Sequence, residues 1–183
     1  MKTMWIQVLA WLAAVTVALL LALAGPNESA LMGRLPVINA KRLNQQPVSF
    51  PQGLPAPRTL ALVAFERGHR REIESWITGL QLRRENSTIA WLKMPVLDDP
   101  GSESARTDIE HGMRARHSAE VDRARLVPVF TDRAAFIRAA GLTGSDHAWV
   151  LVVGRDGQVL ARVEGEYSEE KGQTLRETLA QSF

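Results

Sequence analysis

The chain has 183 residues, a formal net charge of +2 and no cysteine. So small a net charge argues against a broad phosphate-binding surface, and therefore against nucleic-acid binding. Without a cysteine, no thiolate can act as nucleophile, and this excludes disulfide exchange by the chain's own residues. Hydrophobic residues make up 45% of the sequence, which is enough for a packed core that no disulfide staples.

Residues 5–24 form an apolar run that two polar residues interrupt. A run of about 20 apolar residues is long enough to cross a bilayer as a helix. With Lys2 before it and Ala22-Leu23-Ala24 at its end, the run also fits a signal peptide that is cleaved after Ala24. Both interpretations predict a bacterial envelope protein. Its folded part is either anchored in the inner membrane and exposed to the periplasm, or released into the periplasm.

Residues 25–57 are rich in Pro, Asn, Gln and Gly, and they predict a linker that leads into the folded domain of residues 58–183. Two short segments of this linker, residues 36–38 and 47–50, fit edge strands, which tolerate proline.

From residue 59 onward, apolar runs typical of strands alternate with segments of helical spacing. The first predicted elements, in chain order, are a strand at 59–65, a helix at 70–82, a strand at 88–97 and a charged helix at 103–123 that breaks near Gly112. They are followed by a strand at 126–130, a helix that Thr131 or Asp132 caps and Gly141 ends, two strands at 149–153 and 158–163, and a last helix at 168–181. Ser168, three residues before Lys171, forms an incomplete capping box at the start of this last helix.

The last two strands are joined through Asp156-Gly157, a pair that favours a tight hairpin because both residues tolerate a positive φ. The whole order predicts an α/β fold in which parallel strands are followed by an antiparallel hairpin and a closing helix.

This order resembles the thioredoxin superfamily, and in particular its peroxiredoxin-like branch. The segment Val129-Phe130-Thr131-Asp132, followed by Phe136 and then Gly141-Leu142, is similar to the strand–Asp–helix–Gly segment that precedes the final hairpin in that family. The resemblance covers about residues 59–183. It implies a thioredoxin-like mixed sheet with a C-terminal β-hairpin and helix.

Two departures from the family concern its redox site. Where the family places its redox cysteines, after the first central strand, this chain has Glu66-Arg67-Gly68-His69-Arg70-Arg71. Where the family places a cis-proline before the hairpin, this chain has Gly144-Ser145-Asp146-His147. Both halves of the redox site are therefore missing, and binding or assembly is a better expectation than thiol chemistry.

A narrower resemblance is to the mitochondrial ATP synthase assembly-factor family and its bacterial relatives. It is carried by the following short motifs: Leu62-Val63-Ala64-Phe65 followed by Trp76, Gly112-Met113-Arg114, Phe130-Thr131-Asp132, Gly157, and Glu164-Gly165-Glu166-Tyr167-Ser168 with Glu170-Lys171. This resemblance implies an assembly or chaperone-like role at a membrane complex, with an envelope or membrane protein as partner.

Two groups of basic residues are candidates for an interaction surface. Arg67, His69 and Arg70 follow the first central strand, at the sheet edge where open α/β folds bind ligands. Arg114 and Arg116 lie in the charged helix, where they could meet a membrane protein or anionic lipid. The simpler interpretation of both groups is a solvated surface. For the first group, cations at a helix N-terminus also oppose the helix dipole.

No metal, cofactor or catalytic residue is predicted. His111 and His117 are six residues apart, which places them on different faces of a helix rather than in the i, i+4 spacing of a metal-binding pair. A copper-chaperone role would need thiol ligands that the chain lacks.

Two functions remain open. The first is a binding or assembly module that holds a partner protein. The second is a carrier or enzyme that uses Arg67, His69 and Arg70 for a small anionic ligand. A closed, filled loop at residues 67–71 would favour the first, and an open polar cleft there would favour the second.

Overall fold

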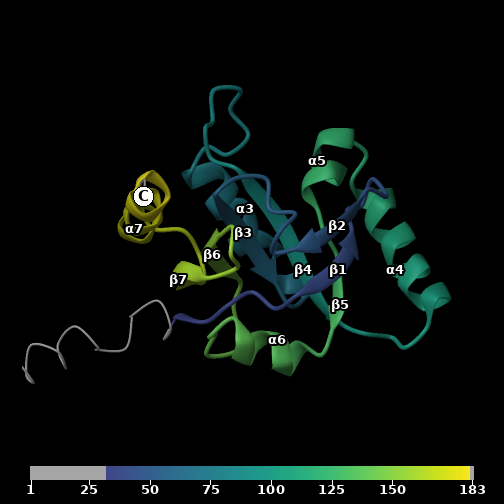
Figure 1. Cartoon of the computed structure of the whole chain (residues 1–183). Coiled ribbons are helices and arrows are strands. Elements are labelled where there is room, and N and C mark those ends of the chain that lie inside the picture. The colour runs from purple at the N-terminus through teal and green to yellow at the C-terminus, as the bar shows by residue number, and fades with distance from the viewer. Residues whose placement is uncertain (1–31, 182–183) are drawn as a thin grey trace, which may run out of the picture.

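The structure, a computed structural model, describes residues 32–181 (Figure 1). The predicted anchor or signal segment at residues 5–24 lies outside this range. Within it, no helix is both long enough and apolar enough to cross a membrane.

A five-stranded mixed sheet forms the centre of the molecule, in the order β5-β4-β3-β6-β7. β3 (Arg58–Ala64), β4 (Trp91–Asp98) and β5 (Val129–Thr131) run parallel to one another. β6 (Trp149–Gly154) and β7 (Val159–Glu164) form a hairpin, and β6 pairs antiparallel to β3. This confirms the predicted α/β class, with a mixed sheet and a C-terminal hairpin.

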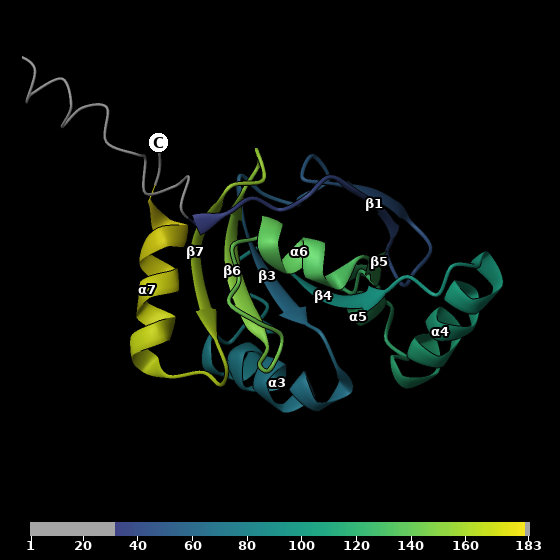
Figure 2. The same cartoon turned by 90° about the horizontal axis from the view of Figure 1, so that it is seen from below.

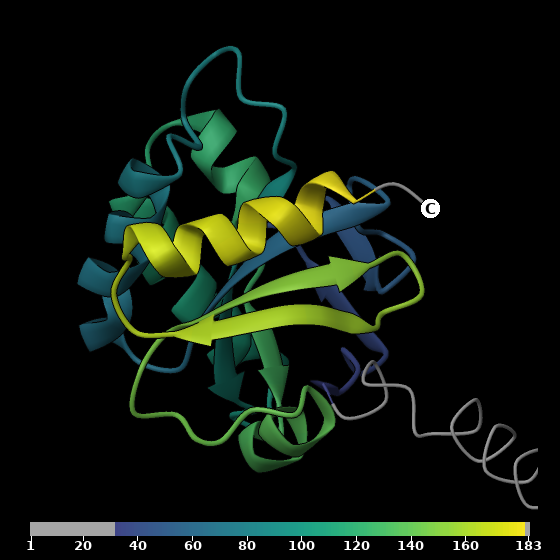
Figure 3. The same ribbon diagram turned by 90° about the vertical axis from the view of Figure 1, so that its left-hand side faces the viewer.

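The two faces of the sheet bury separate apolar clusters, because alternate residues of β3 point to opposite sides. Leu60 and Leu62 pack with α3 (Arg70–Gly79) and α7 (Glu169–Ala180) on one face. Ala61 and Val63 pack with α6 (Arg133–Ala139) on the other. Figure 2 shows α6 against its face of the sheet, and Figure 3 shows α7 lying along the β6–β7 hairpin.

Residues 32–57 add to the second cluster. β1 (Ile38–Lys41) and β2 (Pro47–Phe50) form their own two-stranded antiparallel sheet, in which β1 begins two residues later than predicted. Leu35, Leu43 and Phe50 are at most 1% exposed, so the described part of the predicted linker carries core side chains.

The start of the described chain is bonded to the far hairpin. Leu35 N–H donates to the carbonyl of Gly157 at 2.8 Å, and Val159 N–H donates to the carbonyl of Gly33 at 3.0 Å. The Arg162 guanidinium also donates to the Met32 carbonyl at 2.8 Å. The chain therefore enters the fold beside the turn between β6 and β7.

The predicted charged helix is two helices, α4 (Glu103–Arg116) and α5 (Glu120–Arg125). The predicted break near Gly112 was wrong, because the break lies at residues 117–119. A Cβ added at Gly112 would meet no atom within 4 Å, so this glycine makes no close approach that would bend the helix. At the break, Arg123 Nε donates to the His117 carbonyl at 2.6 Å and fixes the turn between the helices.

Several other boundaries differ from the prediction. The helix expected to reach residue 82 ends at Gly79, and Gln81 then adopts a left-handed φ of +54°, which turns the chain away from the helix axis. β4 begins at Trp91 rather than at residue 88. The β6–β7 turn has Gly157 at φ +88°, while Asp156 keeps a negative φ.

The predicted helix caps are confirmed. Asp132 Oδ1 accepts the Ala135 N–H at 3.0 Å and so begins α6. Ser168 Oγ accepts the Lys171 N–H at 3.3 Å and so begins α7. Each side chain satisfies a backbone donor that the first turn of its helix would leave unpaired.

Candidate functional site

The loop after β3 is filled by its own histidine. His69 is 2% exposed, and its Nδ1 accepts a hydrogen bond from the Phe65 N–H at 3.2 Å. The imidazole also meets the Phe65 ring edge-on, with 6.5 Å between ring centroids. His69 was predicted to be part of an interaction surface. It lies instead in the interior, where its side chain fills the loop.

The arginines of the same loop point outward. Arg67 and Arg70 are exposed, and among residues 32–181 neither side chain has an ion pair or a hydrogen bond. Arg71 is also exposed, but its Nε lies 3.1 Å from Glu166 Oε1. Arg67 belongs to the 3₁₀ turn η1 (Arg67–His69), and Arg70 is the first residue of α3.

Glu72 ties the first turn of α3 to the loop before β6. Its Oε2 accepts the Ala148 N–H at 2.6 Å, and its Oε1 lies 2.9 Å from His147 Nδ1. Partial burial acts to raise the pKa of Glu72, but the bonds from His147 and Ala148 outweigh it and lower that pKa overall. The Glu72 hydrogen bond in turn raises the pKa of His147. We call these contacts of Glu72 with His147 and Ala148 the Glu72–His147 clasp. It was not predicted, because no pattern in the sequence links residues that are 75 positions apart.

His117, the residue that follows α4, is half-buried and feels the charges of several elements. Burial and the charge of Lys93 lower the pKa of His117, and the charges of Arg70 and Arg116 lower it further, while Asp122 acts in the opposite direction. The charges of Arg70 and Arg116 therefore both act on His117, although the two arginines are far apart in the sequence.

Arg116 is exposed and its side chain has no partner among the described residues. Arg114 lies 3.9 Å from Glu110, and its side chain is 28% exposed. We call the exposed group Arg67, Arg70 and Arg116 the arginine edge. Of the five predicted surface residues, His69 is interior, and Arg114 is engaged within α4.

An ion-pair cluster lies beside the arginine edge. Glu74 of α3 binds Lys93 Nζ at 2.8 Å and Arg83 Nη1 at 2.8 Å. Burial raises the pKa of Glu74, but the hydrogen bonds from Arg83 and Lys93 prevail and lower it to about 2. Glu74 therefore compensates part of the positive charge of Lys93 and Arg83.

Within residues 32–181, no group of three or more His, Asp or Glu side chains could hold a metal ion. His111 is exposed on α4, and His117 lies beyond the end of that helix.

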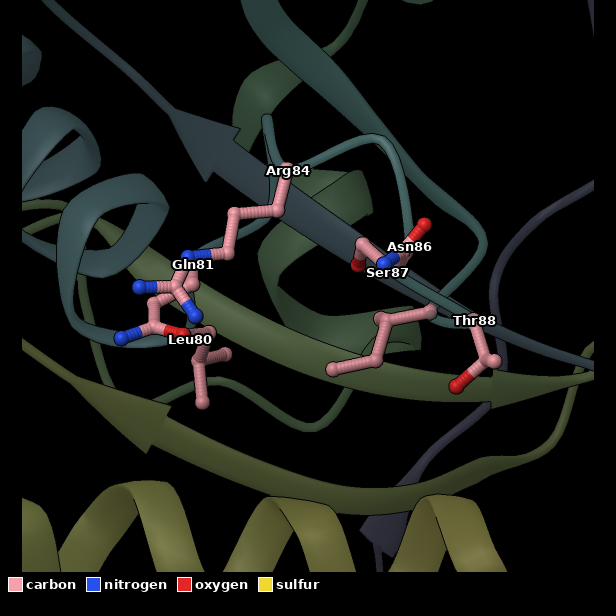
Figure 4. Close-up of a pocket in the computed structure, with 7 residues that line it drawn as sticks. Leu80, Gln81, Arg84, Asn86, Ser87 and Thr88 are labelled. Carbon is pink, nitrogen blue, oxygen red and sulfur yellow. The ribbon is translucent and has the colours of Figure 1, made fainter.

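A shallow pocket of about 260 Å³ lies at the other end of the parallel strands (Figure 4). Its lining comes from the turn between α3 and β4, namely Leu80, Gln81, Arg84, Asn86, Ser87, Thr88 and Ile89. The close-up shows the Arg84 side chain extending toward Gln81. The pocket precedes β4, whereas the arginine edge follows β3, so the two are separate features.

Comparisons with known proteins give a fold and no family. No protein-family model matches the chain. No curated protein matches it either.

Solved structures share its architecture at low sequence identity. A candidate electron transfer protein from Aquifex aeolicus VF5 is 10% identical, with a TM-score of 0.55 over 80% of this chain and 95% of that one. BsSco, a member of the Sco family of cytochrome c oxidase assembly proteins, is 13% identical, with a TM-score of 0.52 over 82% and 94%. The exposed lipoprotein thioredoxin Etrx1 from Streptococcus pneumoniae strain TIGR4 is 9% identical, with a TM-score of 0.50 over 78% and 99%.

These likenesses show that the chain has a thioredoxin-like fold. The chain has this fold without a cysteine. At these identities the comparisons establish the fold alone.

Proposed function

We propose that this protein is a non-redox, partner-binding module that helps to assemble a membrane complex of the bacterial cell envelope. The observation that carries the proposal is the filled loop after β3. In place of a thiol, His69 closes this loop from inside, while Arg67 and Arg70 stand exposed and unpaired at its surface, as far as the described residues are concerned.

The filled loop also weighs against the alternative of a small-anion carrier or enzyme. Such a ligand would need His69 on the wall of an open cleft, together with Arg67 and Arg70. The imidazole is instead 2% exposed and accepts a backbone hydrogen bond. An exposed, charged edge is better suited to a protein surface than to an enclosed small molecule.

Two further arguments support an assembly role. The short motifs described above resemble the ATP synthase assembly-factor family, and BsSco, which has a similar fold, belongs to a family of cytochrome c oxidase assembly proteins. An anchor or export signal at residues 5–24 would place the domain beside envelope complexes. The proposed partner is accordingly an envelope or membrane protein.

Site-specific photo-crosslinking in native membranes tests the proposal. A photoreactive amino acid at Arg71 or Ala115, both exposed, would sit next to the arginine edge without removing any of its members. The Arg71–Glu166 pair that is lost lies at the surface and contributes little. Matched control positions are Arg84 and Arg155, which are exposed elsewhere.

We expect residues 71 and 115 to crosslink to the same protein, and residues 84 and 155 to give no adduct with it. Equal yields at all four positions, or no adduct at 71 and 115, would contradict a partner-binding role for this edge.

A further inference from the structure

The described chain enters the fold at one end of the central sheet. Leu35 N–H donates to the carbonyl of Gly157 at 2.8 Å, and Arg34 N–H donates to the carbonyl of Ala139 at 2.7 Å. Figure 2 shows the start of the described chain, the turn between β6 and β7 and the end of α7 on one side of the molecule, with α3 on the opposite side. The chain start therefore touches both α6 and the β6–β7 turn.

Arginines lie around this entry point. The Arg34 guanidinium donates to the Asp156 carbonyl at 2.5 Å, and Asp156 directly follows Arg155. Arg138, in the last turn of α6, precedes the Ala139 carbonyl that accepts the Arg34 N–H. Arg138 and Arg155 are exposed, and their side chains have no partner within residues 32–181. We call this surface the entry end, and its basic members are Arg34, Arg58, Arg138, Arg155 and Arg162.

The charge of the entry end is mainly positive. Arg58 and Arg162 donate to backbone carbonyls of α7 and of the chain start, and a guanidinium bonded to a carbonyl keeps its charge. Two acidic residues lie with the arginines: Asp156, whose Oδ2 is 3.8 Å from the Arg34 guanidinium, and Glu177 near the end of α7. The arginines therefore outnumber the carboxylates at this end.

The opposite end of the sheet has a different charge. β3, β4 and β5 are parallel, and β7 runs in the same direction, because β6 is antiparallel to both β3 and β7. All four strands therefore end away from the entry end. The acidic residues at or just after their ends are Glu66, Asp98, Asp99, Asp132, Glu164 and Glu166. Since Arg67, Arg70 and Arg71 share that end, its charge is mixed, and an anionic surface would attract the entry end more strongly.

The entry end also carries an exposed apolar side chain. Val37 follows Leu35 by two residues and is 78% exposed, more than any other large apolar side chain in the described part of the chain. A single exposed valine is ordinary on a protein surface. Next to basic residues, it suits the headgroup region of a bilayer, where cations meet lipid phosphates and apolar groups leave water.

The length of chain before Met32 limits how far the entry end can lie from a membrane. Only residues 25–31 separate the apolar run at 5–24 from Met32. Even fully extended, seven residues span at most about 25 Å. If the apolar run anchors the chain, the entry end is the part of the domain that this short tether holds beside the bilayer.

We propose that the entry end rests on the bilayer surface, where Arg34, Arg138 and Arg155 contact anionic lipid headgroups and Val37 lies among them. The proposal goes beyond the partner-binding function and rests on the anchor interpretation of residues 5–24. In this orientation the loop after β3 faces away from the bilayer, so its exposed arginines are free to meet the water-exposed part of a membrane complex.

Quenching by spin-labelled lipid headgroups tests the proposal. The full chain has no cysteine, so each introduced cysteine can carry a single fluorophore. Val37→Cys and Ala139→Cys report on the entry end, and Ala115→Cys and Asp146→Cys are exposed controls elsewhere. In vesicles of equimolar phosphatidylglycerol and phosphatidylcholine, we expect strong quenching at residues 37 and 139 and little at 115 and 146. Quenching at 37 and 139 should fall in pure phosphatidylcholine and with added sodium chloride.

Charge variants locate the contact, with the fluorophore at residue 37. We expect Arg138→Glu, Arg155→Glu to lower the quenching at least about twofold. Arg138→Lys, Arg155→Lys should match the parent chain, because attraction to lipid depends on charge rather than on the guanidinium fork. Lys41→Glu, Arg71→Glu makes the same change in net charge at exposed positions outside the entry end and should also match the parent chain. Circular dichroism confirms that all variants are folded.

Several results would overturn the proposal. They are equal quenching at all four positions, quenching that does not depend on phosphatidylglycerol, and a mature chain in native membranes that begins after Ala24. Absence of quenching at residues 37 and 139 would do the same and would leave the entry end to a protein. The photo-crosslinks at residues 71 and 115 report partner binding separately. A partner captured there without lipid contact at the entry end would refute this inference and leave the proposed function standing.

Discussion

The imidazole of His69 fills the interior of the loop after β3. Because His69 Nδ1 accepts the Phe65 N–H, the neutral ring carries its proton on Nε2. Nε2 has no hydrogen-bond partner among the described residues and lies 3.5 Å from Glu66 Oε1. The imidazole is therefore held by the one hydrogen bond that Nδ1 accepts, and we expect the loss of this acceptor to destabilise the fold.

Two substitutions of His69 distinguish the contribution of Nδ1 from that of Nε2. In His69→Asn, the asparagine Oδ1 would lie near the position of Nδ1 and should keep the bond from the Phe65 N–H. His69→Gln reaches toward Nε2 instead and leaves that N–H buried without an acceptor, which costs about 1–3 kcal/mol. Urea denaturation should rank the parent chain above His69→Asn and His69→Asn above His69→Gln. A glutamine variant as stable as the asparagine variant would show that the Phe65 bond contributes nothing.

The Glu72–His147 clasp predicts a pH window of stability. The pKa of Glu72 is lowered from 4.5, so its contribution is full above pH 4.5 and is lost as the pH falls through the folded-state pKa. The pKa of His147 is raised from 6.5, so its contribution is full below pH 6.5 and is lost as the pH rises through the folded-state pKa.

The difference in unfolding free energy between the parent chain and Glu72→Gln should therefore be largest between pH 4.5 and 6.5. His147→Gln is the control, because it removes the loss at high pH but keeps the part of the loss at low pH that arises from the Ala148 bond. A difference that stays constant as the pH passes beyond both limits would refute the clasp.

At the scale of elements, Tyr167 fills the space between α3 and α7. Its ring meets Trp76 edge-on at 5.2 Å between centroids. A Cβ added at Gly79 of α3 would lie 2.5 Å from this ring, and one added at Gly172 of α7 would lie 2.6 Å from it. Both glycines are therefore needed for close packing.

Two glycine-to-alanine substitutions should change the free energy of unfolding in opposite directions. In a helix interior, Gly→Ala normally stabilises by about 0.5–1 kcal/mol. We expect this at Gly112 in α4, where a Cβ meets nothing, while Gly172→Ala should destabilise by about 1–3 kcal/mol through overpacking against Tyr167. In a Tyr167→Ala background, Gly172→Ala should become stabilising. Thermal unfolding of these variants checks this, and a destabilising Gly172→Ala in that background would contradict it.

Local signals in the sequence predicted local structure well. Asp132 and Ser168 were predicted as caps because a cap needs only residues up to three positions away. The arginine edge could be predicted only in pieces. Arg70 and Arg116 both act on His117, and no pattern within either segment predicts that. The burial of His69 was missed for a similar reason, since histidine in a charged loop looks solvated.

At the scale of the whole molecule, residues 32–57 are part of the folded domain, because they contribute buried side chains to its core. A chain that begins at Arg58 would lose Leu35, Leu43 and Phe50 from the core. Losses of large buried side chains cost about 2–5 kcal/mol each, and their sum is comparable to the stability of a typical domain. We expect a chain that begins at Met32 to unfold cooperatively on heating, and one that begins at Arg58 to show no cooperative transition. Equal melting temperatures for the two chains would contradict this expectation.

The bonds between the start of the described chain and the last hairpin also set an order of folding. Met32 and Arg162 are 130 residues apart in sequence, and Leu35 bonds to Gly157 across a similar distance. A ribosome makes the first partner of each bond long before the second. Residues 32–35 must therefore wait for nearly the entire domain to be synthesised before they have anything to bind, and the fold is completed only after its last strand has emerged.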